Sequence, residues 1–144
     1  MVQPMVQVSI ATFVHDILVN PAATFQGRST ELADEIYPLI FELHLVSPAL
    51  IFGVIPELTV LLTVEEDEIR GKIVKLLSKL YTSELYDYVS QFPKDFKEFS
   101  LRINDRNSSI RTEMVETVIS ILNRKPETRS VLEGKVVYSL CYCT

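Results

Sequence analysis

The residues best able to carry chemistry in this chain are two cysteines and two histidines. Cys141 and Cys143 are separated by one residue, so in an extended tail their side chains point to opposite faces and a disulfide between them would be strained. His15 and His44 stand at no recognisable metal-ligand spacing from the cysteines. We therefore expect free thiols in a reducing compartment and no zinc site.

The acidic run at residues 65–68 is the second candidate for chemistry. A calcium loop needs alternating oxygen ligands around a central glycine, and this run has no glycine. At the start of a predicted helix, carboxylates are instead favoured by the helix dipole. The glycines are scattered singly, so they cannot cradle a phosphate, and no nucleophile, base and carboxylate stand in a recognised order. We predict no catalytic, metal-binding or cofactor-binding residues, and no enzymatic activity.

Composition restricts the class of protein further. The 144 residues carry a formal net charge of −5, with 47% hydrophobic and 23% charged residues. This is ordinary for a folded chain and too apolar for disorder. Nucleic-acid binding needs an excess of Lys and Arg, which this acidic chain lacks, so we expect no direct binding of nucleic acid. With only 4 glycines and 7 prolines, the chain favours helices over a turn-rich sandwich or barrel.

One apolar stretch, residues 43–64, approaches the length of a membrane span. It contains the charged Glu57, His44, and two prolines, Pro48 and Pro56. Ser47 followed by Pro48 is typical of a helix start, with serine as the N-cap. We therefore predict a buried helix in an all-α protein and no membrane span.

The chain contains an internal repeat with a period of 41 residues. Ile69-Arg70 recurs as Ile110-Arg111, and the apolar positions around each copy recur with it. Seven columns are apolar in all three copies, at the spacing of one helix face. The columns are Ile10/Ile51/Phe92, Val14/Ile55/Phe96, Ile17/Leu58/Phe99, Leu32/Ile73/Met114, Ala33/Val74/Val115, Ile36/Leu77/Val118 and Leu39/Leu80/Ile121.

The repeat predicts about three antiparallel helix pairs within residues 1–135, and no assignment for the tail at 136–144. We expect the units at approximately 6–43, 48–81 and 92–122, and the start of a further helix at 126–135. Within them, the first helices should cover 6–19, 48–63 and 93–104, and the second helices 30–43, 67–81 and 109–122. Pro38 and Pro56 should bend the helices that contain them.

A two-helix unit of this period is the signature of a HEAT or armadillo α-solenoid. Asp105 followed by Ile110-Arg111 resembles the HEAT turn, in which the arginine of one repeat can pair with the turn carboxylate of its neighbour. Asp105, Arg111 and Arg70 would form this structural turn ladder. Val64 occupies the aspartate position of the middle unit, so Glu65 or Glu66 would have to serve Arg70. We therefore predict that Arg111→Ala destabilises the chain more than Arg70→Ala.

Three lysines, Lys72, Lys75 and Lys79, recur at helical spacing opposite the apolar face of the predicted helix at 67–81. This lysine stripe is either a solvated helix face or a docking surface for an acidic partner. Tyr81, Tyr86 and Tyr88 are an alternative partner surface, although core packing competes for them.

Several phrases of the sequence resemble one protein family. They are IYPLIFEL, VIPELTVLL, IVKLLSKLY after the acidic turn, and FSLRINDRNSSIR. Together they resemble the N-terminal HEAT region of the cohesin-associated sister-chromatid cohesion proteins, the family first named for precocious dissociation of sisters. The resemblance covers roughly residues 8–129, and Lys75 and Lys79 match its VKLL-x-K phrase. Family members are far longer, so we expect a fragment or short form.

The resemblance implies a non-enzymatic regulator of cohesin in the nucleus, associated with chromatin. Such proteins hold the kleisin subunit of cohesin and recruit factors that release cohesin from chromatin or protect it there. They act in mitotic and meiotic cohesion and in DNA repair. The alternative is a generic HEAT-repeat adaptor for protein transport or complex assembly. The missing motifs and the acidic balance argue against an enzyme or a nucleic-acid binder.

Overall fold

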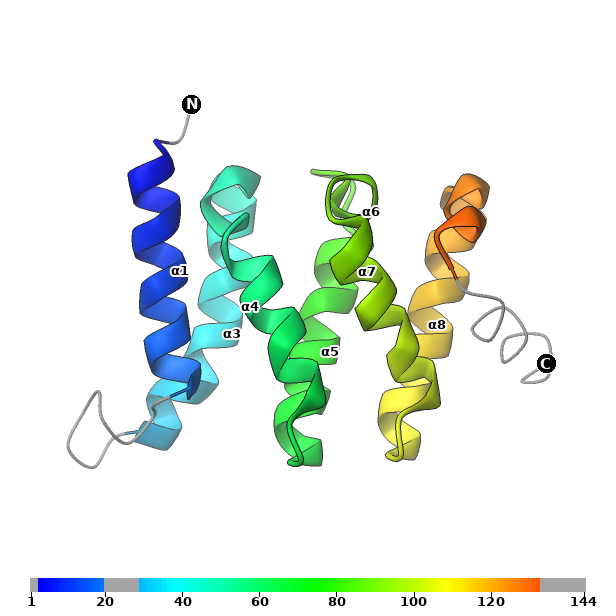
Figure 1. The fold of residues 1–144 in the computed structure, drawn as a ribbon, viewed down its shortest axis with the longest axis horizontal. Helices are drawn as coiled ribbons and strands as arrows, with labels where there is room; N and C mark the ends of the chain where they lie inside the picture. Colours follow the sequence, from blue (N-terminus) through cyan, green and yellow to red (C-terminus); the bar gives the residue numbers. More distant parts are fainter. Residues whose placement is uncertain (1–2, 20–28, 133–144) are drawn as a thin grey trace. The chain divides into compact units, whose positions relative to one another are not determined.

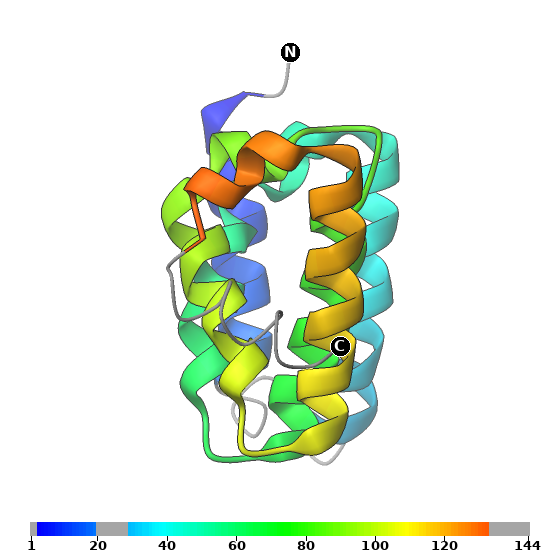
Figure 2. The ribbon, with the colours of Figure 1, turned by 90° about the vertical axis from the view of Figure 1, so that its right-hand side faces the viewer.

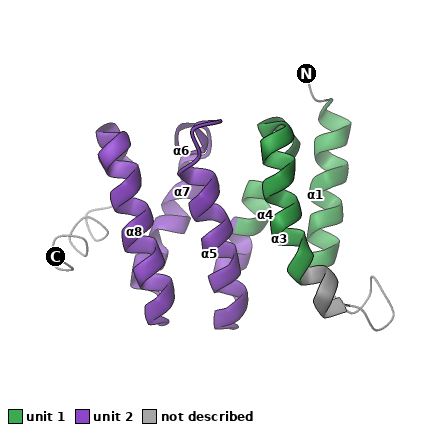
Figure 3. Ribbon diagram, turned by 180° about the vertical axis from the view of Figure 1, so that it is seen from behind, with its two compact units in different colours: residues 1–58 green, residues 59–144 purple. Residues whose placement is uncertain are grey.

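The computed structural model describes residues 3–19 and 29–132, and within these ranges all regular structure is helical (Figure 1). The chain divides into two compact units, residues 1–58 and 59–144, and the boundary falls within α4 (Val54–Val60) (Figure 3). The α-helices are α1 (Pro4–Val19), α3 (Ser29–Val46), α4 (Val54–Val60), α5 (Asp67–Tyr81), α6 (Tyr88–Gln91), α7 (Pro93–Ser100) and α8 (Ser108–Arg124). The 3₁₀-helices are η1 (Pro48–Ile51), η2 (Leu61–Thr63), η3 (Leu101–Asn104) and η4 (Pro126–Ser130). The chain is an all-α segment of the HEAT-repeat α-solenoid class.

The first unit, residues 1–58, packs α1 against α3 and η1. Its buried side chains include Val14 and Ile17, which are three residues apart and lie on the same face of α1. Gly53 lies close to α1, because a Cβ built there would stand 3.0 Å from the Cβ of Ala11. A larger residue at position 53 would therefore push α1 away.

The second unit, residues 59–144, is built on the contact between α5 and α8. Figure 2 shows α7 and η3 running beside α8, with the turn at 105–107 joining them. Tyr81 packs between Phe96 and Phe99, with ring centroids 5.1 and 5.0 Å apart. These rings and the apolar faces of α5 and α8 form one core, which positions the turns that precede the two long helices.

Three of the repeat columns are buried in every copy. They are Val14/Ile55/Phe96, Ile17/Leu58/Phe99 and Ile36/Leu77/Val118. The column ending in Ile121 fails in the first copy, because Leu39 is 43% exposed. Within residues 34–46 of α3, the buried positions are Ile36, Ile40 and His44, so the buried face of this part follows a four-residue spacing past Pro38.

The predicted helices agree best with the structure where the second helix of each pair is expected. The helix α5 has the predicted bounds, and α8 begins one residue earlier and ends two residues later than predicted. The single helix predicted over 48–63 is wrong, since η1, α4 and η2 replace it. Because α4 restarts at Val54, Pro56 falls in its first turn, where a missing N–H costs no helical hydrogen bond, and the predicted bend has no cause there.

The helix predicted over 93–104 is α7 followed by the tighter η3, and the helix predicted from 126 begins as η4. Residues 133–135, the tail at 136–144 and both cysteines lie outside the described residues. The division into three repeat units stays a prediction. Across the two described ranges, every helix is too short or too polar to cross a membrane.

Candidate functional site

Arg70, in the first turn of α5, is 3% exposed and forms hydrogen bonds to the turn that precedes its own helix. Its Nη1 donates to the backbone carbonyls of Val64 and Glu65, both at 2.8 Å. These carbonyls lie in the connection between η2 and α5, outside the hydrogen bonds of either helix. The guanidinium therefore satisfies backbone acceptors of the connection itself.

One period later, Arg111 makes the same two bonds. Its Nη1 donates to the carbonyls of Asp105 at 2.8 Å and Arg106 at 2.9 Å. Asp105 and Arg106 are the residues that correspond to Val64 and Glu65. The period of 41 residues is therefore also found in the hydrogen bonds: each arginine donates to two backbone carbonyls of the turn before its own helix.

The side chain of Asp105 links the two turns. Nε and Nη2 of Arg70 donate to its two carboxylate oxygens at 3.0 and 2.9 Å, and this side chain is 1% exposed. The N–H of Asn107 also donates to it at 2.9 Å. Burial raises the pKa of Asp105, but the hydrogen bonds from Arg70 and Asn107 together lower it by more, so its pKa falls below the ordinary value. The hydrogen bonds to Asp105 also raise the pKa of Arg70, and the pair stays ionised.

A second layer of contacts surrounds this pair in solvent. Asp67 accepts from Arg70 Nη2 at 2.6 Å, from Arg106 Nε at 3.1 Å and from Asn107 Nδ2 at 3.2 Å. Hydrogen bonds from Asn107, Arg70 and Arg106 lower the pKa of Asp67 to about 2. Arg106 also pairs with the Glu65 carboxylate at 3.0 Å. Exposed pairs of this kind contribute little stability, so the buried Arg70–Asp105 pair dominates the cluster.

The partner assignment predicted for the turn ladder is wrong in both turns. Arg70 has Asp67 and Asp105 as carboxylate partners, in place of the side chains of Glu65 or Glu66. The Asp105 carboxylate bonds to Arg70 of the preceding copy, while Arg111 bonds to backbone carbonyls. The physical reason is the packing of α5 on α8, which brings the two turns together. The rule that one repeat's arginine meets its neighbour's carboxylate would have found this pair had it been applied to Arg70.

Sequence reasoning also missed Asp67, Arg106 and Asn107 as members of this cluster. Asn107 is the N-cap of α8, where its side-chain oxygen accepts from the N–H groups of Ser109 and Ile110. The signal available in the sequence was an asparagine directly before a serine pair at a predicted helix start.

The lysine stripe lies on the outer face of α5 within the second unit. Lys75 and Lys79 are exposed, while Lys72 is partly buried and pairs with Glu68 at 2.8 Å. Lys72 and Lys75 line one side of a groove of 450 Å³ between α5 and α8, whose apolar lining includes Val74 and Ile110. Two of the three lysines of the stripe, Lys72 and Lys75, therefore border this groove, and Lys79 does not. Whether it binds a partner stays a prediction.

The tyrosines predicted as an alternative surface are mostly interior. Tyr81 is 5% exposed and Tyr88 is fully buried, and only Tyr86 is half-buried. Over the part of the chain that the structure describes, no three His, Cys, Asp or Glu side chains are placed to hold a metal ion. The arrangement offers hydrogen-bonding groups, charged side chains and a groove, which are features of a surface that binds another protein.

Comparison with known proteins identifies relatives over nearly the whole chain. A family model described as sister chromatid cohesion protein PDS5 matches residues 2–141. The sister chromatid cohesion protein PDS5 homolog A of Mus musculus is 31% identical over 124 residues, 85% of this chain and 9% of that protein. The homolog A of Danio rerio is 29% identical over the same shares, 85% and 9%. The homolog B of Gallus gallus is 29% identical over 98 residues, 68% of this chain and 7% of that protein. No solved structure matches the chain.

Proposed function

Because this chain belongs to the sister chromatid cohesion protein PDS5 family, we propose that it acts in sister-chromatid cohesion as a non-enzymatic helical segment that binds the cohesin complex. The observation that carries the proposal is the family match, which extends over residues 2–141. The chain spans about 9% of the length of the homolog A relatives it matches. The proposal therefore concerns one contact surface of a larger activity.

The finer parts of the proposal concern partners and place. They are contact with the kleisin subunit of cohesin, recruitment of factors that release or protect cohesin, and a nuclear, chromatin-associated location. All three follow from the resemblance of the chain to the family. The helical fold supports them, because stacked helix pairs offer extended surfaces that suit protein partners.

The surface that we assign to cohesin is the lysine stripe and the groove beside it. Lys75 and Lys79 are exposed on α5, and neither takes part in the buried turn cluster. Lys75 and Lys79 attract an acidic segment, whereas the charge of Lys72 is already paired with Glu68. Val74 and Ile110 give the groove beside them an apolar lining, and Asp67, Glu68 and Glu113 line it as well, so we place the acidic groups of the partner at Lys75 and Lys79. Since the lysines are solvated, the attraction acts mainly on the association rate and weakens with salt.

The test is a double charge reversal, Lys75→Glu with Lys79→Glu, in binding to purified cohesin that contains its kleisin subunit. The matched control is Lys94→Glu with Arg129→Glu, which makes the same change of charge at two exposed positions away from the groove. Circular dichroism must first show equal helicity, which we expect because glutamate is a good helix former. We predict slower association for the stripe variant only, with a smaller difference at higher salt.

Two outcomes would contradict the proposal at different levels. If the stripe variant associates at the wild-type rate at low and moderate salt, the stripe is only a solvated face and the binding surface lies elsewhere. If the wild-type chain itself shows no binding to cohesin, the cohesin partner is wrong, and a general adaptor role becomes the better account.

A further inference from the structure

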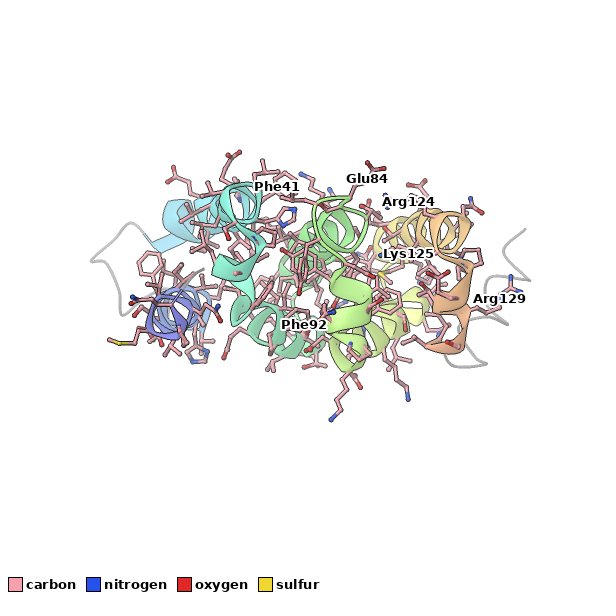
Figure 4. The ribbon with its side chains drawn as sticks, turned by 90° about the horizontal axis from the view of Figure 1, so that it is seen from above. Phe41, Glu84, Phe92, Arg124, Lys125 and Arg129 are labelled. Atoms are coloured by element: carbon pink, nitrogen blue, oxygen red, sulfur yellow. The ribbon has the colours of Figure 1, made fainter. Side chains whose placement is uncertain are left out.

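The groove of 450 Å³ beside the lysine stripe lies between α5 and α8, which are side by side in the view from above (Figure 4). Charged side chains of both signs line this groove, and three of them already have close partners. Glu68 pairs with Lys72 at 2.8 Å, and Asp67 accepts hydrogen bonds from Arg70 and Arg106. Two charged residues of the lining therefore remain for a ligand.

These two residues are Lys75 of α5 and Glu113 of α8. Lys75 is exposed and Glu113 is partly buried, and neither forms an ion pair with another residue that the structure describes. Because they come from different helices, one side of the groove offers a positive charge and the other side a negative one. A segment with charges of only one sign would be repelled at one side, so the groove favours a ligand that carries both signs.

Gly71 also lines the groove, at a position where the fold does not require a glycine. It lies in the second turn of α5, and glycine is among the weakest helix formers. A Cβ built on Gly71 would have Cγ1 of Ile110 as its nearest neighbour beyond the local helix backbone, at 3.9 Å, an ordinary contact distance. One period away in either direction the sequence has a threonine, Thr30 or Thr112. The glycine therefore leaves a space that the protein itself does not fill.

The space over Gly71 is apolar at its surface. The Cα of the glycine and the side chain of Ile110 border it, and so do the methylene groups of Lys72 and Lys75, whose charges stand at the far ends of these chains. An apolar side chain that covers these groups is removed from water favourably. A polar side chain would lose its hydration there without gaining a hydrogen bond.

We propose that this groove binds a segment of a partner polypeptide in which an apolar side chain stands between an acidic and a basic residue, and that Gly71 provides the space for the apolar side chain. The acidic residue pairs with Lys75 and the basic residue with Glu113, so the segment crosses from α5 to α8 in one direction. This inference rests on the proposed function for the choice of groove. It deepens that function, because it names the chemistry of the bound segment and the residues that select it.

The test uses short blocked peptides, and binding to the whole chain is followed by NMR shifts of the Gly71 and Ile110 amides. The mixed peptide is acetyl-Glu-Gly-Leu-Gly-Lys-amide, for which we expect saturable shifts at millimolar concentrations. A peptide with serine in place of leucine, and one with lysine at both ends, should each bind about fivefold more weakly or worse. The peptide with two lysines is the stricter comparison, because the net charge of −5 on the chain attracts it.

Variants of the lining identify the residues that select the segment. Gly71→Leu fills the space and should weaken binding of the mixed peptide about tenfold or more, and Gly71→Ala should weaken it less. Glu113→Lys should weaken it about threefold or more, because the basic residue loses its partner. The matched controls are Ser120→Ala and Glu116→Lys, at exposed positions of α8 outside the groove lining, and both should bind as the wild type does.

Stability separates a glycine that serves binding from one that serves the fold. Gly71→Ala should unfold at a higher urea midpoint than the wild type, because alanine is the better helix former and its Cβ fits. Weaker binding by a more stable variant then reports on the groove alone. The proposal would be overturned by a lower midpoint, by an absence of saturable shifts, by unchanged binding to Gly71→Leu, or by equal binding of the serine peptide or the peptide with two lysines.

Binding of Gly71→Leu to purified cohesin distinguishes this inference from the proposed function. If the wild-type chain binds the mixed peptide but not cohesin, the cohesin partner is wrong and the preference of the groove stands. If the wild type and Gly71→Leu bind cohesin equally well, the role of Gly71 is wrong and cohesin remains the partner.

Discussion

The turn before α5 and the turn before α8 are two copies of one local structure. Each follows a 3₁₀-helix, η2 or η3, and each is held by an arginine that donates hydrogen bonds to two backbone carbonyls of the turn. Their N-cap residues share a backbone conformation, with φ −71° and ψ 112° at Glu66 and φ −84° and ψ 124° at Asn107. The backbone and the arginine are therefore repeated, whatever the other side chains are.

The two turns differ in the side chains that reach beyond this local structure. Asp105 stands where the other turn has Val64, and its carboxylate bonds to Arg70 in the neighbouring copy. Asn107 caps its helix through its side chain, whereas Glu66 makes no such bond. The comparison teaches that the arginine forms the turn, while the aspartate connects one turn to the next.

The largest effect should follow removal of the connecting carboxylate. Asp105→Ala removes the buried carboxylate that accepts two bonds from Arg70 and leaves the guanidinium with the exposed Asp67 as carboxylate partner, a change that costs about 3–5 kcal/mol for a buried pair. The control is Val64→Ala in the equivalent position, a partly buried residue for which we expect a loss of about 1 kcal/mol or less. Urea unfolding followed by circular dichroism measures both. A loss for Asp105→Ala no larger than for Val64→Ala would mean that the turns are not connected through this residue.

A smaller effect should follow changes at the two N-caps. Asn107→Ala removes a capping side chain and should cost about 1 kcal/mol, while Glu66→Ala should be nearly neutral. The converse change, Glu66→Asn, introduces a capping side chain on the same backbone and should raise stability by about 0.5–1 kcal/mol. The free energy of unfolding in urea distinguishes these results. Equal losses at the two positions would show that the caps do not differ as the structure indicates.

The smallest effect on the connected turns should come from mild acid. The pKa values of Asp105 and Asp67 are lowered in the folded state, so their stabilising contribution is complete above the unfolded value near 4 and is lost only as pH falls further. The first unit should behave differently, because burial lowers the pKa of His44. The unfolded chain then binds a proton below about pH 6.5 that the folded His44 resists, and stability falls as pH decreases from 7 to 5.

The measurement is the urea midpoint at pH 7 and pH 5 for the wild type, His44→Gln and Asp105→Asn. We expect the decrease in midpoint between these pH values to persist in Asp105→Asn and to shrink in His44→Gln. A decrease that vanished in Asp105→Asn would place the titration in the turn cluster instead.

Sequence patterns predict some parts of this molecule well, for physical reasons that the structure makes plain. The helix α5 has both a strong apolar face and an acidic first turn, so its bounds are encoded locally. The stretch 48–63 is interrupted near Gly53, whose need for space comes from the Cβ of Ala11, far away in the sequence. Burial of Ile40 in place of Leu39 likewise depends on which face of α3 the rest of the unit covers.

The candidate site was predictable in its residues more than in its contacts. The period placed Arg70, Arg111 and Asp105 at the turns, but residue types alone do not say which copy's carboxylate approaches which arginine. The exposure of Lys75 and Lys79 follows from helical spacing, whereas the groove beside them depends on how α8 packs on α5.

The most direct test of the connection between the turns compares Arg70→Ala with Arg111→Ala in urea unfolding. Both variants lose the hydrogen bonds from the guanidinium to two carbonyls, but only Arg70→Ala also removes two hydrogen bonds from the buried Asp105 carboxylate, which keeps Arg102 Nη1 at 3.5 Å. Arg70 is buried and Arg111 is exposed. We predict a loss of about 3–5 kcal/mol for Arg70→Ala and about 1 kcal/mol for Arg111→Ala, the reverse of the order that the sequence alone suggests. Equal midpoints, or a lower midpoint for Arg111→Ala, would contradict the account.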